Sequence, residues 1–180
     1  MSAVARRYAK ALFDLASEAG LREPVAQELE QLRSVVTSTD LAPIWNNPRL
    51  GIEQRRALVN VLQQQLGLSA LVGRFLQYLA DVRRLRELPD IQRFFQELLD
   101  EALRRTRARF RSAQALDDAT VARIASAFAE LVGKQVLPTV QVAPELLGGL
   151  IVEIEGKVFD GSVRSQLARM TARLIGSASN

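Results

Sequence analysis

The sequence contains no cysteine and no histidine among its 180 residues. Without cysteine there can be no disulfide bridge, no cysteine metal site and no thiol nucleophile. Without histidine the chain lacks the commonest metal ligand and the commonest general base. Carboxylate chemistry remains, but no pair of acidic residues lies in an apolar setting that would separate their two pKa values. We therefore expect a protein that is not an enzyme and that carries no cofactor and no metal.

Long apolar runs are also missing, and the N-terminus lacks the basic, apolar and small-residue regions of a secretory signal peptide. These absences predict a soluble protein that stays where it is made. Hydrophobic residues nevertheless make up 48% of the chain, which is enough for a proper core in one ordinary domain or two small ones.

The basic residues outnumber the acidic ones by four, and all but Lys10, Lys134 and Lys157 are arginine. This bias can indicate phosphate recognition, or it can reflect a genome that favours arginine codons. The second explanation fits better, because most of the arginines are scattered along predicted helices and are not interleaved with aromatic residues. The alternative hypothesis is a basic helical nucleic-acid-binding protein that uses a cluster formed by Arg104, Arg105, Arg107, Arg109 and Arg111.

Helical periodicity runs from the N-terminus to about residue 105 and predicts six helices. The predicted helices lie near residues 3–19, from 24 onward, around 41–45, at 52–66, after the capping residue Ser69, and from about residue 89. Gly20 and Gly67 suit the position after a helix, and Pro24 suits the first helical position. Asp40 is the expected cap of the short third helix. Because the connections are short, we expect a six-helix bundle.

The hydrophobic period changes to two from Ala108, which predicts a strand with one wet face. A helix then follows from the cap Asp117 to Gly133, and a second strand carries Val136, Val140 and Val142. Pro138 cannot donate to a strand ladder, so an edge position or a bulge is expected there.

The last part of the chain changes from strand to helix within a few residues. Residues 150–154 alternate as a strand, 155–156 offer a turn, and 158–159 form a short extended run. Asp160 or Ser162 can then cap a helix. The expected fold is α plus a small α/β domain, with a six-helix bundle over residues 1–105 and a β-α-β-β-α domain over residues 106–180.

Several motifs resemble the ATP synthase delta subunit family, whose mitochondrial member is the oligomycin-sensitivity-conferring protein. Gly148-Gly149 ahead of a strand, followed by Gly-Lys-Val-Phe-Asp-Gly-Ser-Val-Arg at 156–164, is similar to the family's C-terminal motif. Residues 7–13 (Arg-Tyr-Ala-Lys-Ala-Leu-Phe), 47–48 (Asn-Pro), 75–80 (Phe-Leu-Gln-Tyr-Leu-Ala) and 84–85 (Arg-Leu) extend the resemblance over the whole chain. Val82-Arg83 departs from it, because the family tends to place a polar or glycine turn there. The glycine pair is expected to serve backbone geometry, since no Gly-Lys-Ser/Thr phosphate motif follows.

The resemblance implies a static tether with no active site of its own. Delta subunits join the catalytic head of the F-type ATP synthase to the membrane-anchored peripheral stalk, so that the head does not turn with the rotor. A peripheral position at the cytoplasmic face of a bacterial cell membrane is expected, as is one copy per complex and a monomer in isolation.

The same resemblance implies two partners. The alpha subunit's N-terminal helix would lie in a groove between the first and fifth helices. By residue, this predicts contacts from Tyr8, Ala11, Leu12, Leu15, Phe75, Tyr78, Leu79 and Val82. The stalk's b subunit would meet the C-terminal domain at Val163, Leu167, Met170, Arg164 and Arg169. The alternative for most of the apolar members, including Leu12, Leu15 and Phe75, is an ordinary place in the core. Ala11 and the two tyrosines are better groove candidates, since a small residue admits a partner helix and tyrosine tolerates partial exposure.

Overall fold

The computed structural model describes residues 3–38, 42–45, 47 and 49–167, and these residues divide between two compact units. The units are Met1–Ala102 and Leu103–Asn180, so the division falls three residues before the expected boundary. The expected cap Asp40 lies outside the described residues. None of the described helices is long and apolar enough to cross a membrane.

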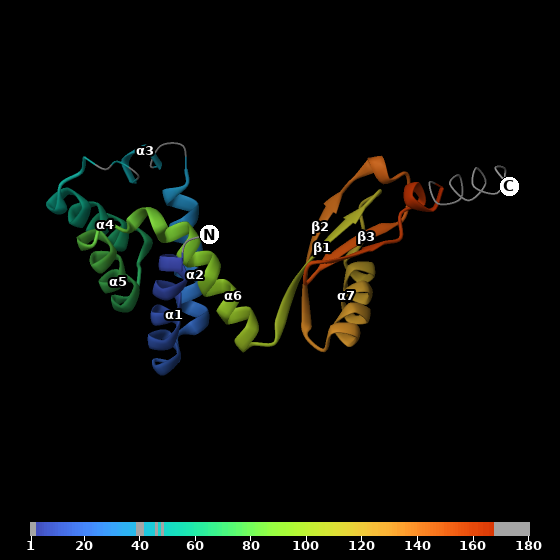
Figure 1. Ribbon diagram of the computed structural model, residues 1–180, viewed down its shortest axis with the longest axis horizontal. Coiled ribbons are helices and arrows are strands. Elements are labelled where there is room, and N and C mark those ends of the chain that lie inside the picture. Colours follow the sequence, from blue (N-terminus) through green and yellow to red (C-terminus); the bar gives the residue numbers. More distant parts are fainter. Residues whose placement is uncertain (1–2, 39–41, 46, 48, 168–180) are drawn as a thin grey trace. The chain divides into compact units, whose positions relative to one another are not determined.

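The first unit is helical throughout (Figure 1). Its helices are α1 (Ala3–Glu18), α2 (Arg22–Val36), α3 (Ala42–Trp45), α4 (Ile52–Leu66), α5 (Ala70–Asp81) and α6 (Leu88–Ala102), with a 3-10 turn over Leu85–Glu87. Helix α4 has the predicted bounds, and Gly67 adopts a φ of +62° at its C-terminal end. Helix α2 begins two residues earlier than predicted, and α3 is a single turn.

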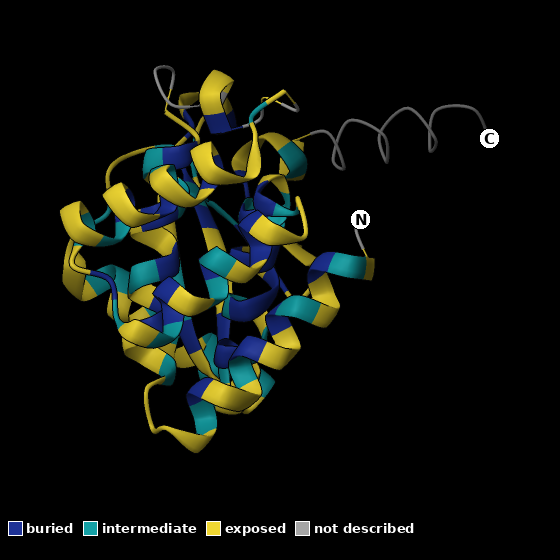
Figure 2. Ribbon diagram, turned by 90° about the vertical axis from the view of Figure 1, so that its left-hand side faces the viewer, coloured by how far each residue is buried: buried dark blue, intermediate teal, exposed yellow. Residues whose placement is uncertain are grey.

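The core of the first unit lies where α1 and α2 pack against α6. Alanines at 5, 9 and 16 are fully buried on α1, so α6 can approach this helix closely. Phe13 and Phe95 meet edge to face, with ring centroids 5.4 Å apart. The indole N–H of Trp45 donates to the Leu85 carbonyl at 2.9 Å and fixes α3 to the 3-10 turn. Figure 2 shows buried positions recurring along the helices in bands, with exposed positions on their other sides.

The second unit is a four-stranded mixed sheet with one covering helix. It comprises β1 (Arg105–Ser112), α7 (Asp118–Val132), β2 (Gln135–Val142), a 3-10 turn over Pro144–Leu146, β3 (Leu150–Ile154) and β4 (Lys157–Asp160). The strand order is β2-β1-β3-β4; β1 and β2 are parallel and the other two pairs are antiparallel. The expectation for Pro138 is confirmed, because β2 is an edge strand. The short extended run predicted at 158–159 is strand β4.

Helix α7 covers one face of this sheet. Phe110, Val152 and Ile154 form the centre of the core, and α7 packs over them with Phe128. Asp117 caps α7 as predicted, and Gly133 ends it with a φ of +69°. No residue of α7 is fully buried, so its apolar side chains remain partly exposed even where they meet the sheet.

The glycine pair ahead of β3 lies directly against the backbone of residues 161–163, which follow β4. Gly149 has a φ of +81°, and a Cβ there would lie 3.0 Å from the Ser162 Cα and closer still to the Gly161 carbonyl. Val163 donates its N–H to the Gly148 carbonyl at 3.0 Å. The pair therefore serves backbone geometry: it permits a left-handed turn and a close approach of two backbone segments.

Candidate functional site

A groove of about 660 Å³ lies between α1 and α5 on the first unit. Its lining comes from five residues of α1 and four residues of α5. These residues are Arg7, Tyr8, Ala11, Leu12, Leu15, Leu71, Arg74, Phe75 and Tyr78. Two arginines and no acidic residue belong to this lining, so the groove is apolar with two positive charges.

Helix α1 divides its apolar residues between two adjacent faces. One face, with Ala5, Ala9 and Ala16, is buried in the core. The other, with Ala11 and Leu15, lies toward the groove, and Leu15 is 51% exposed. Successive residues are about 100° apart around an α-helix. Ala11 and Leu15 on the groove side are therefore each followed by a fully buried residue, and one amphipathic helix serves both the core and a surface groove.

Helix α5 supplies the opposite wall at the same helical spacing. Leu71, Phe75 and Tyr78 lie three and four positions apart and so share one face of the helix. The start of α5 is fixed by Ser69, whose hydroxyl accepts from the Val72 N–H at 3.4 Å. Both the hydroxyl and the N–H of Ser69 donate to Glu28 of α2, at 2.9 and 3.0 Å. These bonds hold the groove wall on the body of the unit.

Two tyrosines from the two walls meet within the groove lining. The rings of Tyr8 and Tyr78 lie 6.1 Å apart at an interplanar angle of 72°, an edge-to-face arrangement. Tyr78 is nevertheless 51% exposed. The groove is therefore formed without a partner, and it retains apolar surface that a partner could cover.

Six of the eight predicted groove residues line this groove, and two do not. Leu79 is fully buried on the core side of α5. Val82 is 37% exposed and follows the last residue of α5, outside the groove lining. Leu71 was missed although it continues the spacing of Phe75 and Tyr78 by one turn. Arg7 and Arg74 were missed because an apolar pattern selects no charged residue. The role of all these residues in partner binding stays a prediction.

Three of the five predicted contact residues of the second unit lie on a helical turn at 163–167. Val163 is 39% exposed, Leu167 is 51% exposed, and Arg164 is exposed as well. Met170 and Arg169 lie outside the described residues. The three described side chains are thus accessible, and their contact with a partner stays a prediction.

The titratable groups give no sign of a catalytic centre in the described part of the chain. Hydrogen bonds from Arg56, at 2.8 and 3.1 Å, lower the pKa of Asp81 below its ordinary value. Hydrogen bonds from the side chain and the N–H of Thr120 lower the pKa of Asp117 in the same way. An exposed ion pair and a helix cap explain these shifts, and neither lies in the groove. The described residues also contain no group of acidic side chains arranged to hold a metal ion.

Comparison with known proteins gives a consistent match along the chain. The family model described as ATP synthase delta (OSCP) subunit matches residues 4–174. The ATP synthase subunit delta of Symbiobacterium thermophilum is 42% identical and covers 99% of this chain and 96% of its own. That of Geobacter sp. strain M21 is 39% identical over 94% of both chains. A chain of the Toxoplasma gondii mitochondrial ATP synthase hexamer shares the fold with a TM-score of 0.69 at 19% identity, covering 97% of this chain and 98% of that one.

Proposed function

The chain belongs to the ATP synthase delta (OSCP) subunit family, and we propose that it works by holding two neighbouring subunits at once, one on each unit. Membership makes it a non-catalytic stator subunit of the F-type ATP synthase, which links the catalytic head to the peripheral stalk. The specific contacts proposed are the alpha subunit's N-terminal helix in the groove and the b subunit on the second unit. The observation that carries the proposal is the open apolar groove between α1 and α5.

An amphipathic helix fits the groove for geometric reasons. Each wall repeats its apolar residues at three- and four-residue spacing, which is the spacing that a helix lying between them would present in return. Ala11 leaves room for the occupant, while Leu15 and Tyr78 offer half-exposed apolar surface on the two sides. Arg7 and Arg74 favour an occupant with acidic residues beside its apolar stripe.

The stalk contact is proposed for the exposed turn at 163–167. Val163 and Leu167 are four positions apart and so share a helix face, and Arg164 lies beside them. Their accessible apolar surface supports a contact with another helix. Because the synthase of a bacterium is anchored in its cell membrane, the proposed position is peripheral, at the cytoplasmic face.

The nucleic-acid alternative gains no support from the comparisons, whose named relatives are ATP synthase subunits. Two of the clustered arginines also have acidic partners. Arg109 contacts Glu153 at 3.1 Å, and Arg111 contacts Glu145 at 2.8 Å. Carboxylates this close to the arginines would repel a phosphate backbone.

The groove is tested by titrating the full-length protein with a synthetic peptide of the alpha subunit's N-terminal helix. Ala11→Asp places a charge in the apolar groove and should weaken binding by about 2 kcal/mol, roughly thirtyfold. Ala122→Asp, at an exposed position of α7, makes the same change outside the groove and should leave the affinity unchanged. If the NMR resonances of α1 and α5 do not move on titration, the groove assignment falls while the family membership stands.

A further inference from the structure

The α5 wall of the groove belongs to a closely packed pair of helices, α4 and α5. Near the end of α5, Asp81 accepts hydrogen bonds from Arg56 of α4 at 2.8 and 3.1 Å. Near its start, Gly73 lies so close to α4 that a Cβ there would clash with the Gln63 side chain. Because the two helices are joined at both ends of α5, the position of the groove wall is the position of the α4–α5 pair.

One side chain of α2 joins this pair to the rest of the unit. The Glu28 Oε2 atom accepts hydrogen bonds from the Ser69 N–H at 3.0 Å and from the Ser69 hydroxyl at 2.9 Å. No other hydrogen bond between described residues joins the α4–α5 pair to α1, α2 or α6. Helix α2 also packs against α1, which forms the opposite wall of the groove. The bonds at Glu28 therefore link the two walls through α2.

Glu28 replaces a residue that the sequence of α5 lacks. In a capping box, the serine before a helix accepts from the third helical N–H, and a glutamate or glutamine at that third position accepts from the serine N–H. The Ser69 hydroxyl accepts from the Val72 N–H at 3.4 Å, but the Val72 side chain is apolar and fully buried. Glu28, 41 residues earlier in the chain, supplies the missing carboxylate. Its negative charge also lies beside the N-terminal end of α5, where the helix dipole favours it.

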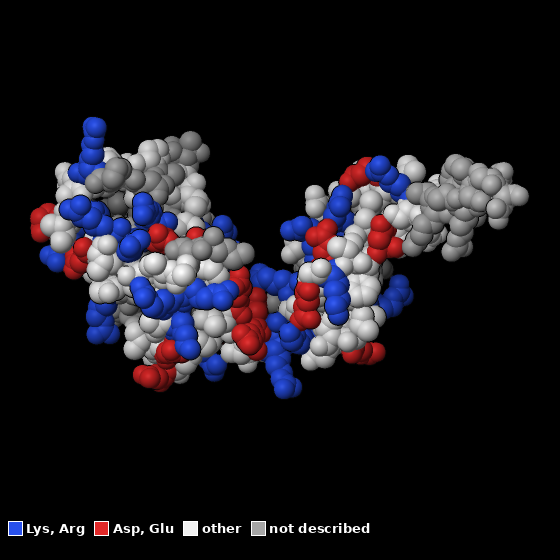
Figure 3. Space-filling view, in the orientation of Figure 1, with Lys and Arg blue, Asp and Glu red and all other residues white. Residues whose placement is uncertain are grey.

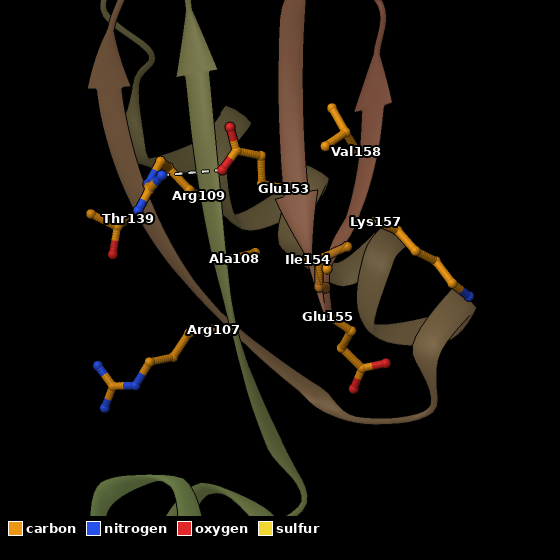
Figure 4. A pocket seen from close by; sticks show the side chains of 10 residues that line it. Arg107, Ala108, Arg109, Thr139, Glu153, Ile154, Glu155, Lys157 and Val158 are labelled. Carbon is orange, nitrogen blue, oxygen red and sulfur yellow. Dashed lines mark hydrogen bonds and ion pairs between the residues drawn. The ribbon is translucent and has the colours of Figure 1, made fainter. Parts of the chain in front are cut away.

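The surroundings of Glu28 differ from those of the acidic residues that pair with arginine or lysine. Figure 3 shows acidic side chains lying among basic ones over the visible surface of both units. In the hollow on the sheet of the second unit, for example, Glu153 meets Arg109 at 3.1 Å (Figure 4). No described basic side chain forms such a pair with the half-buried Glu28. Its two bonds to Ser69 therefore compensate the partial loss of hydration of its carboxylate.

We propose that Glu28 is a positioning residue for the groove: from α2 it holds the start of α5, and so it sets the affinity of the groove for a partner helix. Glu28 does not line the groove, so it acts only through Ser69 and α5. Leu71, two residues after Ser69, is the first lining residue of the wall that these bonds hold. The inference rests on the function proposed above for the groove, and it adds a residue on which that function depends.

The test measures the binding of the alpha-subunit peptide to the full-length protein by calorimetry. Glu28→Ala removes both bonds, and the dissociation constant should rise about fivefold, because the α5 wall then occupies its binding position for a smaller fraction of the time. Glu28→Gln keeps a side-chain oxygen that can accept both bonds, so its dissociation constant should stay within about twofold of that of the parent. Rescue by glutamine separates the hydrogen bonds of Glu28 from its charge.

Glu30→Ala is the matched control. Glu30 also lies on α2 and accepts a hydrogen bond from Gln92 of α6 at 2.7 Å. Its loss removes the same charge and a bond between two helices, but it does not involve the α4–α5 pair, so the affinity should change by less than about twofold. Equal losses for Glu28→Ala and Glu30→Ala would overturn the proposal, because binding would then follow net charge or general stability.

A change at the other end of the bond keeps the proposal testable if Glu28→Ala folds poorly. Ser69→Ala removes the hydroxyl and keeps the N–H, so it should raise the dissociation constant by about threefold. The effect of Glu28→Ala should be smaller in this background, since the two residues act together. Unchanged affinity in both single variants would overturn the positioning role while the parent still binds the peptide. Failure of the groove function gives a different result, because the parent itself would then not bind.

Discussion

Replacing Leu15 with alanine tests the groove with little disturbance of the free protein. The Leu15 side chain lies on the groove side of α1 and is 51% exposed, whereas Leu12 beside it is fully buried. The exposed half of the Leu15 surface thus contributes nothing to the stability of the chain without a partner, and it becomes buried only when the groove is occupied. The substitution should therefore affect binding more than it affects folding.

The magnitude follows from the surface that remains to be covered. Burying a leucine side chain completely is worth about 1.5–3 kcal/mol. Because Leu15 has about half of this burial left to complete, covering it contributes about 1 kcal/mol to binding. Alanine retains little of that surface, so the dissociation constant of the alpha-subunit helix should rise about fivefold.

Isothermal titration calorimetry of the full-length protein with the alpha-subunit peptide measures this change. Leu131→Ala is the matched control, because Leu131 is 65% exposed on a helix of the other unit. This substitution removes the same atoms outside the groove. The variant should therefore bind the alpha-subunit peptide with the same dissociation constant as the parent protein. Equal affinity of both variants and the parent would refute the reasoning, since the exposed half of Leu15 would then stay uncovered in the complex.

Two further predictions concern stability. Gly149→Ala should lower the free energy of unfolding by about 2 kcal/mol or more, because the added methyl group would clash with the Gly161 carbonyl. Gly156 has a φ of +75° but open space around it, so Gly156→Ala should lower the free energy of unfolding by only about 1 kcal/mol. Hydrogen exchange of the β1 and β3 amides measures the loss of stability in each variant. Equal losses in the two variants would contradict the close contact between Gly149 and the Gly161 carbonyl. Arg56→Gln should lower the free energy of unfolding at neutral pH. The bond with Arg56 lowers the pKa of Asp81 below its ordinary value of 3.8, so the Arg56–Asp81 ion pair stabilises the folded state only where Asp81 is ionised, above about pH 4. In urea unfolding the difference from the parent should fade as the pH falls below about 4, and a constant difference would rule out this linkage.

The helix and strand order could be predicted from the sequence because local signals agree with the global fold. Helices that end at a glycine, such as α4 and α7, have the expected C-terminal residue. Strand β1 was predicted to begin at Ala108 but begins at Arg105. The error arose because its first residues are charged and polar, so the apolar alternation becomes visible only later. At the end of α5, Arg83 adopts a φ of +57°, a conformation that glycine usually provides and that the sequence therefore does not reveal.

The groove could be predicted only in part, because the distinction between core and surface is not local. Leu79 and Tyr78 are neighbours on α5, and an apolar pattern includes both, yet one is fully buried and the other is half exposed. Which of them faces the core depends on where α1, α2 and α4 pack, and this is decided by contacts far apart in the chain. Arg7 and Arg74 likewise become groove residues only through the packing of α1 beside α5.

A subunit that holds its neighbours still benefits from surfaces that are formed before binding. The buried alanines of α1 and the bonds between Ser69 and Glu28 fix both groove walls, so little conformational freedom remains to be lost when a helix enters. The two proposed contact surfaces also differ: the groove offers tyrosine and leucine with two arginines in its lining, and the turn at 163–167 offers Val163 and Leu167 on one side of a single helical turn. This difference would direct each partner to its own unit, as a tether between two different subunits requires.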